Sequence, residues 1–344
     1  MDTSIFEGTE TVDYCYEFVN GSCPKADRTS SVRVLLYILM TLIILFTIVG
    51  NLLLIISVFH FKHLQTPTNY LILSLATTDF LLGCLVMPYS MVRSVETCWY
   101  LGMPFCKIHT SFDIMLSTAS ILHLCFISVD RYYAVCDPLR YKLRITFFSV
   151  QIMIFISWGV SAVFAFALIY FKLNLKGIEA FYYNDIACNG SCTLVFNEIS
   201  GVIASIISFY IPAVAMLCIY CKLYFVAMKQ VRSINRITIE IQNIRVNRSR
   251  CSRKQEQKAA KTLGIVVGTF LICWSPFFVC NTMDAFVSHS SSPVLLDTLV
   301  WLGYLNSTFN PVIYGFFFAW FRKAVTIIYT CKIFQPASSR INMY

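Results

Sequence analysis

Seven long apolar segments divide the chain, and polar or charged stretches separate them. Each holds 20 to 26 residues, and together they contain two charged side chains, Asp79 and Asp113. At about 1.5 Å of rise per helical residue, each segment can cross a hydrocarbon core roughly 30 Å thick. The sequence therefore predicts an all-α membrane protein, folded as a seven-transmembrane helix bundle. The segments are residues 34–59, 70–89, 108–129, 147–171, 199–221, 262–283 and 298–321.

The composition also indicates that lipid is the solvent. Of the 344 residues, 57% are hydrophobic and 13% are charged, whereas soluble domains carry about 25% charged residues. A disordered chain or a nucleic-acid-binding tail would be far more polar. A soluble globule of this size could not bury so much apolar surface.

The charges outside the spans predict the orientation. With the N-terminus outside, the inner segments hold 20 of the 27 Lys and Arg residues and 4 acidic residues, while the outer segments hold 7 basic and 12 acidic ones. Lys and Arg collect on the cytoplasmic side of membrane proteins. We therefore expect an extracellular tail at 1–31, the transmembrane domain at 32–318, and a short amphipathic eighth helix with a cytoplasmic tail at 319–344. The basic charge then reflects orientation, and we expect no nucleic-acid partner.

Residues 222–261 carry 11 of the basic side chains. Such a segment suits contact with anionic membrane lipid. It equally suits a docking surface for a cytoplasmic protein, and the charge count leaves both interpretations open.

Six of the 15 cysteines fall on the predicted outer side, where oxidising conditions favour disulfides. Six cysteines form three bridges in 15 possible pairings, so the count leaves the connectivity open. Asn20 and Asn189 begin outer Asn-x-Ser sequons and are candidate glycosylation sites, although the position of Asn189 between two cysteines crowds it. Cys331 follows the amphipathic stretch and is a candidate palmitoylation site. The six outer cysteines are Cys15, Cys23, Cys98, Cys106, Cys188 and Cys192.

Asp113 is one of two acidic residues inside the spans. It lies seven residues after Cys106, or about 10 Å down a helix, at a depth that suits a pocket open to the outside. The spans contain no Lys or Arg that could neutralise it. Because a carboxylate in a membrane is costly, it calls for a function, and a cationic ligand is the natural partner. The alternative is a protonated carboxyl that bonds to a neighbouring helix.

Asp79 is the other acidic residue inside the spans. Further polar residues of the spans suit a cation site around it. Oxygen ligands of this kind hold small hard cations, so a sodium ion is a candidate occupant, and we expect no other metal and no cofactor. The alternative is a neutral hydrogen-bond network. The other polar residues of this predicted group are Ser120, Asn306, Ser307 and Asn310.

Short motifs follow one another in a set order along the spans, and in this order they resemble the rhodopsin-like (class A) G-protein-coupled receptors over nearly the whole chain. Residues 306–321 and 258–264, with the cysteine-rich N-terminus, are similar to the trace amine-associated receptor family. Phe318 and Ala319 depart from that family's usual pattern. The landmarks are Gly50-Asn51, Asp79, Cys106, Asp130-Arg131-Tyr132, Trp158, Pro212, Tyr220, Phe270, Trp274 with Pro276, and Asn310-Pro311 with Tyr314.

The resemblance implies a receptor of the plasma membrane, with no enzymatic activity, for small protonated aromatic amines of the phenethylamine or tyramine type. It implies a heterotrimeric G protein, Gs, as the signalling partner, and cyclic AMP as the product of signalling. The ammonium group would meet Asp113, and aromatic and hydroxyl side chains would surround the ring. The implied binding residues are Asp113, Ser117, Ser205, Ser208, Trp274, Phe277, Phe278 and Tyr304.

The resemblance also implies an activation switch and a disulfide pattern. A packing switch lies below the pocket, Pro276 acts as a hinge, and Arg131 pairs with Asp130 and Glu256 at rest. The implied bridges are Cys106–Cys192, Cys15–Cys188 and Cys23–Cys98. The switch residues are Ile121, Asp130, Arg131, Tyr132, Pro212, Tyr220, Glu256, Phe270, Pro276, Pro311 and Tyr314.

Other functions fit less well. An amine transporter would usually show inverted repeats and helices broken in mid-membrane, whereas this chain shows no repeat and its seven spans do not divide evenly. A retinal photoreceptor needs a Lys in the last span, and residues 298–321 contain none. An intramembrane enzyme would need a paired catalytic site, for which Asp79 and His123 are the only candidates. A serotonin- or catecholamine-type receptor is the closest alternative.

Overall fold

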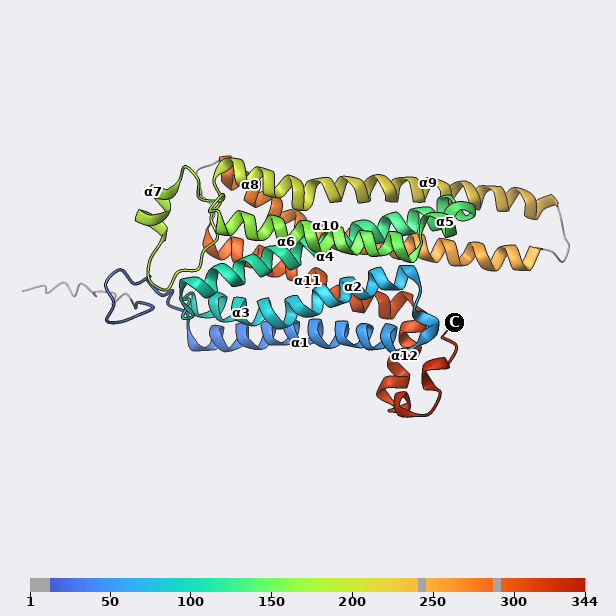
Figure 1. Ribbon diagram of the computed structural model, residues 1–344, viewed down its shortest axis with the longest axis horizontal. Helices are drawn as coiled ribbons and strands as arrows, with labels where there is room; N and C mark the ends of the chain where they lie inside the picture. The colour runs from blue at the N-terminus through green and yellow to red at the C-terminus, as the bar shows by residue number, and fades with distance from the viewer. Residues whose placement is uncertain (1–12, 241–245, 287–291, 344) are drawn as a thin grey trace, which may run out of the picture.

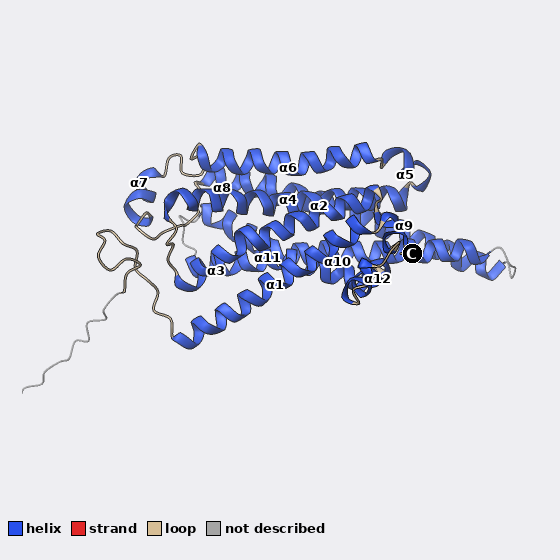
Figure 2. Cartoon of the chain, turned by 60° about the horizontal axis from the view of Figure 1, so that its bottom comes forward, coloured by secondary structure: helices blue, strands red, loops and turns tan. Residues whose placement is uncertain are grey.

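The computed structural model describes residues 13–240, 246–286 and 292–343, and between residues 230 and 261 it describes the backbone alone. Long, roughly parallel helices form a bundle (Figures 1 and 2). The N-terminal segment lies at one end of the bundle and the C-terminus at the other. The described residues contain two isolated β-bridges and no longer strand.

Six helical rods are long and apolar enough to cross a membrane, and a seventh forms the first part of a pair bent by 100°. The prediction of seven membrane-crossing helices is confirmed. Two rods contain a π-helical turn, η2 (Leu82–Val86) and η4 (Ile206–Tyr210). The rods are α1 (Ser30–His60), α2 (Pro67–Leu81) continued by α3 (Met87–Glu96), α4 (Gly102–Cys136), α6 (Phe147–Tyr170), α8 (Glu198–Ser205) continued by α9 (Ile211–Glu240), α10 (Val246–Phe286) and α11 (Pro293–Phe317).

Short helices join or follow the rods. The predicted eighth helix is α12, which turns away from α11 and buries one face, including Trp320 and Ala324, while Arg322 and Lys323 stay exposed. The seventh rod ends four residues before the predicted limit of 321, because Phe318 adopts an extended backbone conformation. The short helices are α5 (Pro138–Arg144), α7 (Glu179–Phe181) and α12 (Ala319–Tyr329).

Hydroxyl and amide side chains mark where several rods begin. Thr66 accepts a hydrogen bond from the backbone N–H of Asn69, and Pro67 takes the first helical position, where no N–H is needed. Thr146 forms a reciprocal capping box with Ser149. The Asn197 side chain caps α8 by accepting a hydrogen bond from the backbone N–H of Ser200. These side chains satisfy N–H groups that the first turn of a helix leaves free.

The bundle presents apolar side chains to its surroundings and keeps polar ones inside. Phe155 and Phe316 are each 76% exposed, while Asp79 and Asp130 are fully buried. Hydroxyls within the spans bond to carbonyls one turn back, as Thr47 does to Ile43. This distribution is the reverse of a soluble protein and fits a lipid solvent, in which unpaired polar groups are costly.

Helix α4, the third rod, lies at the centre of the bundle. Rod α4 packs against α2, α6, α9 and α10, and α11 packs against α1 and α10. Glycines permit the closest approaches: a Cβ at Gly50 would lie 2.7 Å from the Pro311 ring, and one at Gly303 would lie 2.7 Å from the Trp274 ring. Because α4 packs against four other rods, its polar residues lie in the middle of the bundle.

Substituting Gly50 with Ala tests the contact between α1 and α11. The added methyl group would press on the rigid ring of Pro311. Overpacking of this kind costs about 1–3 kcal/mol, so the midpoint of thermal unfolding in detergent should fall. Gly159→Ala is the matched control, because its methyl group meets nothing within 4 Å. Equal melting temperatures for the two variants would contradict the contact.

Candidate functional site

Asp113 lies half-buried on α4 and faces α11. The Tyr304 hydroxyl donates a hydrogen bond of 2.8 Å to one carboxylate oxygen, and the Ser117 hydroxyl donates one of 3.4 Å to the other. No Lys or Arg of the described residues forms an ion pair with it. The carboxylate is thus held in position by neutral groups and keeps the capacity to bind a cation.

A second layer of polar residues, which the sequence reasoning missed, supports Tyr304. Ser90 on α3 lies 3.3 Å from the Tyr304 hydroxyl and 3.3 Å from Nε2 of His109. The same ring nitrogen lies 3.2 Å from the carbonyl oxygen of Val86, at the end of the π-helical turn. His109 could have been found from its spacing, because it precedes Asp113 by four residues and shares its helix face.

Aromatic side chains of α10 form the predicted cluster. The ring centroid of Trp274 lies 5.8 Å from that of Phe278 and 6.2 Å from that of Phe277. Phe278 stacks on Phe209, another residue that the sequence reasoning missed, at 4.7 Å. The Trp274 ring lies against Gly303 of α11, one residue before Tyr304. The rings therefore pack between α10, α11 and the fifth rod, which consists of α8, η4 and α9.

The hydroxyls of Ser205 and Ser208 already have partners. Ser205 donates to the carbonyl of Gly201 at 2.8 Å and accepts from the amide nitrogen of Asn281 at 3.1 Å. Ser208 accepts from Thr118 at 3.4 Å. The fifth rod is thereby tied to α10 and α4 by polar groups near the aromatic cluster.

Asp79 accepts three hydrogen bonds from residues of the polar group that the sequence predicts around it. The hydroxyls of Ser120 and Ser307 bond to one oxygen at 2.8 and 2.7 Å, and the amide of Asn310 bonds to the other at 2.7 Å. All four residues are buried. Three helices, α2, α4 and α11, thus meet at one carboxylate.

Several buried polar atoms lack a partner among the described residues. They are both amide atoms of Asn306, the side-chain oxygen of Asn51, the Tyr314 hydroxyl, the Trp274 indole nitrogen, Nδ1 of His109 and the Ser161 hydroxyl. Unpaired buried polar groups are costly, and Asn306 directly precedes Ser307, a donor to Asp79, so a polar occupant such as water or an ion fits there. Oxygen donors beside Asp79 fit a small hard cation.

At the inner end of α4, Asp130 is fully buried and holds Arg131. Nε of Arg131 donates to it at 2.8 Å, as do the hydroxyls of Thr68 at 2.8 Å and Tyr141 at 3.1 Å. Burial and the charge of Asp130 raise the pKa of Tyr141, so its hydroxyl stays a donor. The side chain of Glu256 lies outside the described residues, and its contact with Arg131 stays a prediction.

The other predicted switch residues lie along the middle and inner bundle. Ile121 and Phe270 belong to one buried cluster, and Pro212 is buried. Pro276 and Pro311 are interior to α10 and α11. The ring of Tyr220 lies against Gly264, and Nζ of Lys222 lies 5.9 Å from the ring centroid of Tyr132. The structure thus places these residues without testing their role.

The end of the bundle that carries the N-terminal tail holds three disulfides. Cys106 pairs with Cys192, as expected. The other expected pairings were wrong: Cys15 pairs with Cys98, and Cys23 pairs with Cys188.

The backbone explains the pairing. The N–H of Cys23 bonds to the carbonyl of Asn189, and the N–H of Asn189 bonds to Gly21, which sets Cys23 beside Cys188. A Cβ at Gly190 would lie 2.8 Å from Cβ of Cys15, and Gly190 also accepts from the N–H after Cys98. The turn of the tail decides which cysteines meet, and no sequence spacing records it.

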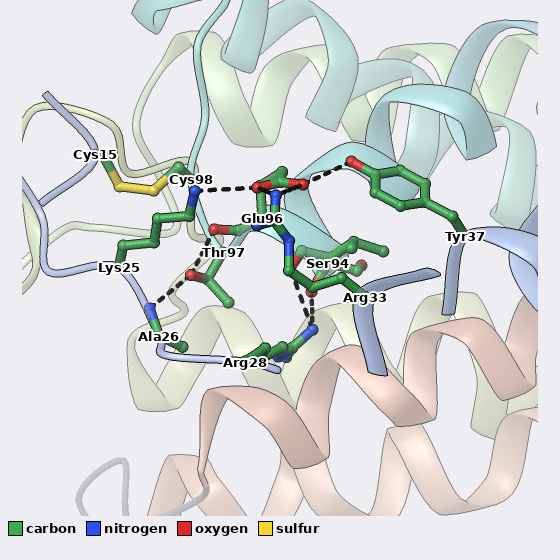
Figure 3. A network of polar contacts seen from close by, with 11 residues as sticks. Cys15, Lys25, Ala26, Arg28, Arg33, Tyr37, Ser94, Glu96, Thr97 and Cys98 are labelled. Carbon is green, nitrogen blue, oxygen red and sulfur yellow. Dashed lines mark hydrogen bonds and ion pairs between the residues drawn. A yellow bond between two sulfur atoms is a disulfide. The ribbon is translucent and has the colours of Figure 1, made fainter. Parts of the chain in front are cut away.

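An ionic network fastens the tail to the end of α3 (Figure 3). Glu96 contacts Lys25 at 3.1 Å, accepts from Tyr37 at 2.9 Å and pairs with Arg33. Arg28 donates to the carbonyl of Ser94. Nearby, Arg93 forms an ion pair of 3.7 Å with Asp297 of α11. The N-terminal tail is thus held at the end of the bundle, against the end of α3.

The modification candidates occupy exposed positions. The side-chain amide of Asn189 donates to the carbonyl of Asn20 at 3.2 Å, so the two sequons adjoin. Cys331 is exposed two residues beyond the end of α12. Glycosylation and palmitoylation of these residues stay predictions.

Comparisons with known proteins agree with this architecture. Residues 50–314 match the family described as 7 transmembrane receptor (rhodopsin family). The chain is 58% identical to trace amine-associated receptor 1 of Macaca mulatta, with 96% of this chain and 98% of that protein covered. This chain belongs to the trace amine-associated receptor family. It is also 56% identical to trace amine-associated receptor 1 of Homo sapiens, with the same coverage, and 48% identical to trace amine-associated receptor 4 of Mus musculus, with 97% and 96% covered.

Family membership makes this chain a multi-pass membrane receptor and not an enzyme. Receptors of this family have a small-molecule ligand outside and a G protein inside, and the two polar ends of α4 match those two tasks. The departures at Phe318 and Ala319 lie at the start of α12, far from Asp113 along the fold, and they leave membership unchanged.

The disulfide pattern of this receptor can be tested by peptide mapping. Chymotryptic digestion of the non-reduced receptor should release the Cys15 peptide bound to the Cys98 peptide, because the tail turn holds those residues together. The Cys23 peptide should join the fragment that holds both Cys188 and Cys192. The reduced digest is the control. A pair of peptides joined through Cys23 and Cys98 would overturn the assignment.

Proposed function

We propose that this receptor binds small protonated aromatic amines at Asp113 and signals through Gs at the plasma membrane, with its N-terminus outside. The observation that carries the proposal is a carboxylate held by Tyr304 and Ser117, with no cation of the described protein paired to it. The names of its relatives, which are trace amine-associated receptors, support the class of ligand.

The carboxylate supplies the main attraction. At an effective dielectric constant near 20, two opposite charges about 3 Å apart attract with roughly 5 kcal/mol before desolvation is subtracted. Tyr304 fixes the direction of the carboxylate, so the ammonium group meets an oriented acceptor.

The aromatic ring then points to the cluster of Trp274, Phe277 and Phe278. A cation near these ring faces adds about 0.5–2 kcal/mol. The hydroxyls of Ser205 and Ser208, on the fifth rod, are the polar groups for a ring substituent. Phenethylamine- and tyramine-like ligands meet both requirements, and the Asn281 bond to Ser205 would have to rearrange for a ring hydroxyl.

Signalling requires that the ligand favour one helix arrangement over another. The buried Ile121 and Phe270 lie between the two ends of α4, and Pro276 interrupts the hydrogen bonds of α10, which makes a hinge there. At the inner end, Arg131 is held by Asp130. In the other helix arrangement, Arg131 would be released from Asp130 and would offer its cationic group to Gs. Tyr220 and Tyr314 would support that arrangement.

Asp113→Ala should abolish cyclic AMP responses to phenethylamine and tyramine while surface expression persists. Loss of a buried charge pair costs about 3–5 kcal/mol, or roughly a hundredfold or more in potency. Asp297→Ala, which removes another outer carboxylate, is the control and should shift potency little. An unchanged dose–response curve for Asp113→Ala would sink the assignment, and responses limited to serotonin or catecholamines would favour the other amine receptors. Uptake of labelled amine would instead reveal a transporter.

We propose a sodium ion as the occupant of the cluster around Asp79. The ligands would be the oxygens of Asp79, Ser120 and Ser307, helped by the unpaired side-chain oxygen of Asn306. A cation there stabilises the helix arrangement that encloses it, and by linkage it weakens binding of a ligand that prefers the other arrangement.

Replacing sodium with N-methylglucamine at constant ionic strength should therefore raise amine affinity by about fivefold or more. Asp79→Asn should remove this dependence, because the amide lacks the negative charge. Ser157→Ala, a buried hydroxyl on α6, is the control and should keep the sodium effect. A radioligand competition assay measures both, and a full sodium effect in Asp79→Asn would exclude the site.

A further inference from the structure

A groove opens on the lipid side of the bundle, where α1, α11 and α12 meet. Its volume is about 520 Å³, within the range of sites for small molecules. Almost all of its lining is apolar, and Arg322 of α12 is its one charged residue. The apolar lining includes Phe46, Val49, Leu53, Val312, Phe321 and Val325.

Small residues keep the groove open. Gly50 and Gly315 line it, and the nearest atom to a Cβ built on Gly315 is 3.9 Å away, on the Phe321 ring. Val49 and Val312 are about half exposed on its two walls, at 52% and 43%. The hollow therefore opens toward the bilayer and not toward the ligand site at Asp113.

Arg322 stands where the apolar groove meets the inner face. One nitrogen, Nη1, donates to the carbonyls of Gly315 and Phe316 at 3.0 and 2.8 Å, which satisfies the last turn of α11. Its Nε and Nη2 groups make no hydrogen bond or ion pair among the described residues. An arginine fixed in this way presents a planar donor pair of the geometry that phosphate accepts.

Arg322 lies in a C-terminal segment whose charged residues are all basic. Residues 319–344 contain Arg322, Lys323, Lys332 and Arg340 and no Asp or Glu. The end of α1 and the turn that follows add Lys62. This surface attracts an anion from the inner leaflet, and a second copy of the same chain would bring only more positive charge to it.

We propose that this groove is a binding site for one anionic phospholipid of the inner leaflet. An acyl chain lies among Val49, Val312 and Val325, and the headgroup phosphate accepts from Nε and Nη2 of Arg322. The lipid would join α12 to α1 and so fix the angle of α12 below the bundle. The proposal is independent of the amine site.

The test uses the full-length receptor, purified in detergent, stripped of lipid and incubated with phosphatidylserine or phosphatidylcholine. Native mass spectrometry counts the lipids that each receptor retains. The wild type should retain one phosphatidylserine in preference to phosphatidylcholine, and inorganic phosphate should not displace it. Val49→Trp fills the groove, and Arg322→Gln removes the charged donor. Each should lower phosphatidylserine retention by about tenfold, the effect of one lost charge-assisted hydrogen bond or its equivalent.

Controls separate the site from general effects. Val163→Trp adds the same ring on an exposed position of α6, and Lys332→Gln removes another nearby charge. Both should retain phosphatidylserine, whereas Arg322→Lys, which keeps the charge but lacks the planar donor pair, should retain less than the wild type. Equal retention of the two lipids by the wild type, or full retention by Val49→Trp or Arg322→Gln, would overturn the proposal. A lipid-free dimer that Val49→Trp dissociates would show that a second copy occupies the groove.

Discussion

The bilayer offers no hydrogen bonds, and this constraint shapes the whole receptor. Each backbone group in the spans must find its partner within a helix, and hydroxyls such as Thr47 bond to their own helix. Charge is therefore confined to the ends of the rods, with two exceptions. Asp79 is enclosed by three donors, whereas Asp113 is oriented by two hydroxyls and keeps its capacity for a cation. Asp79 thus has more hydrogen-bond donors than Asp113, which leaves more of the Asp113 carboxylate open to the proposed amine.

Helix α4 connects the proposed ligand site to the proposed signalling end. It carries Asp113 toward one face and Asp130 with Arg131 at the other, and it packs against four other rods. A change at one end reaches the other only if the packing between them has two arrangements. The buried cluster with Ile121 and Phe270, together with the Pro276 hinge, is where such a change can occur. The tail and its disulfides, by contrast, hold the outer end in place.

Much of the fold could be read from the chain because lipid imposes simple rules on composition. Runs without charge predict the rods, and the caps at Thr66 and Thr146 mark two of their starts. Asp113, Asp79 and Arg131 stood out because charge is rare in the spans. His109, Ser90 and Phe209 did not, because a polar or aromatic residue at helical spacing is ordinary. Only the contacts of α3, α4 and the fifth rod give them their positions.

The amino-acid sequence by itself determined the seven spans, the predicted orientation and the two membrane carboxylates, since each follows from the cost of placing charge in lipid. The tertiary structure decided which distant groups meet. It set Tyr304 on Asp113, placed Cys23 beside Cys188 and ended α11 at Phe317, so that α12 turns along the groove at Arg322. These contacts depend on backbone turns and on the packing of rods far apart in sequence, and no local pattern encodes either.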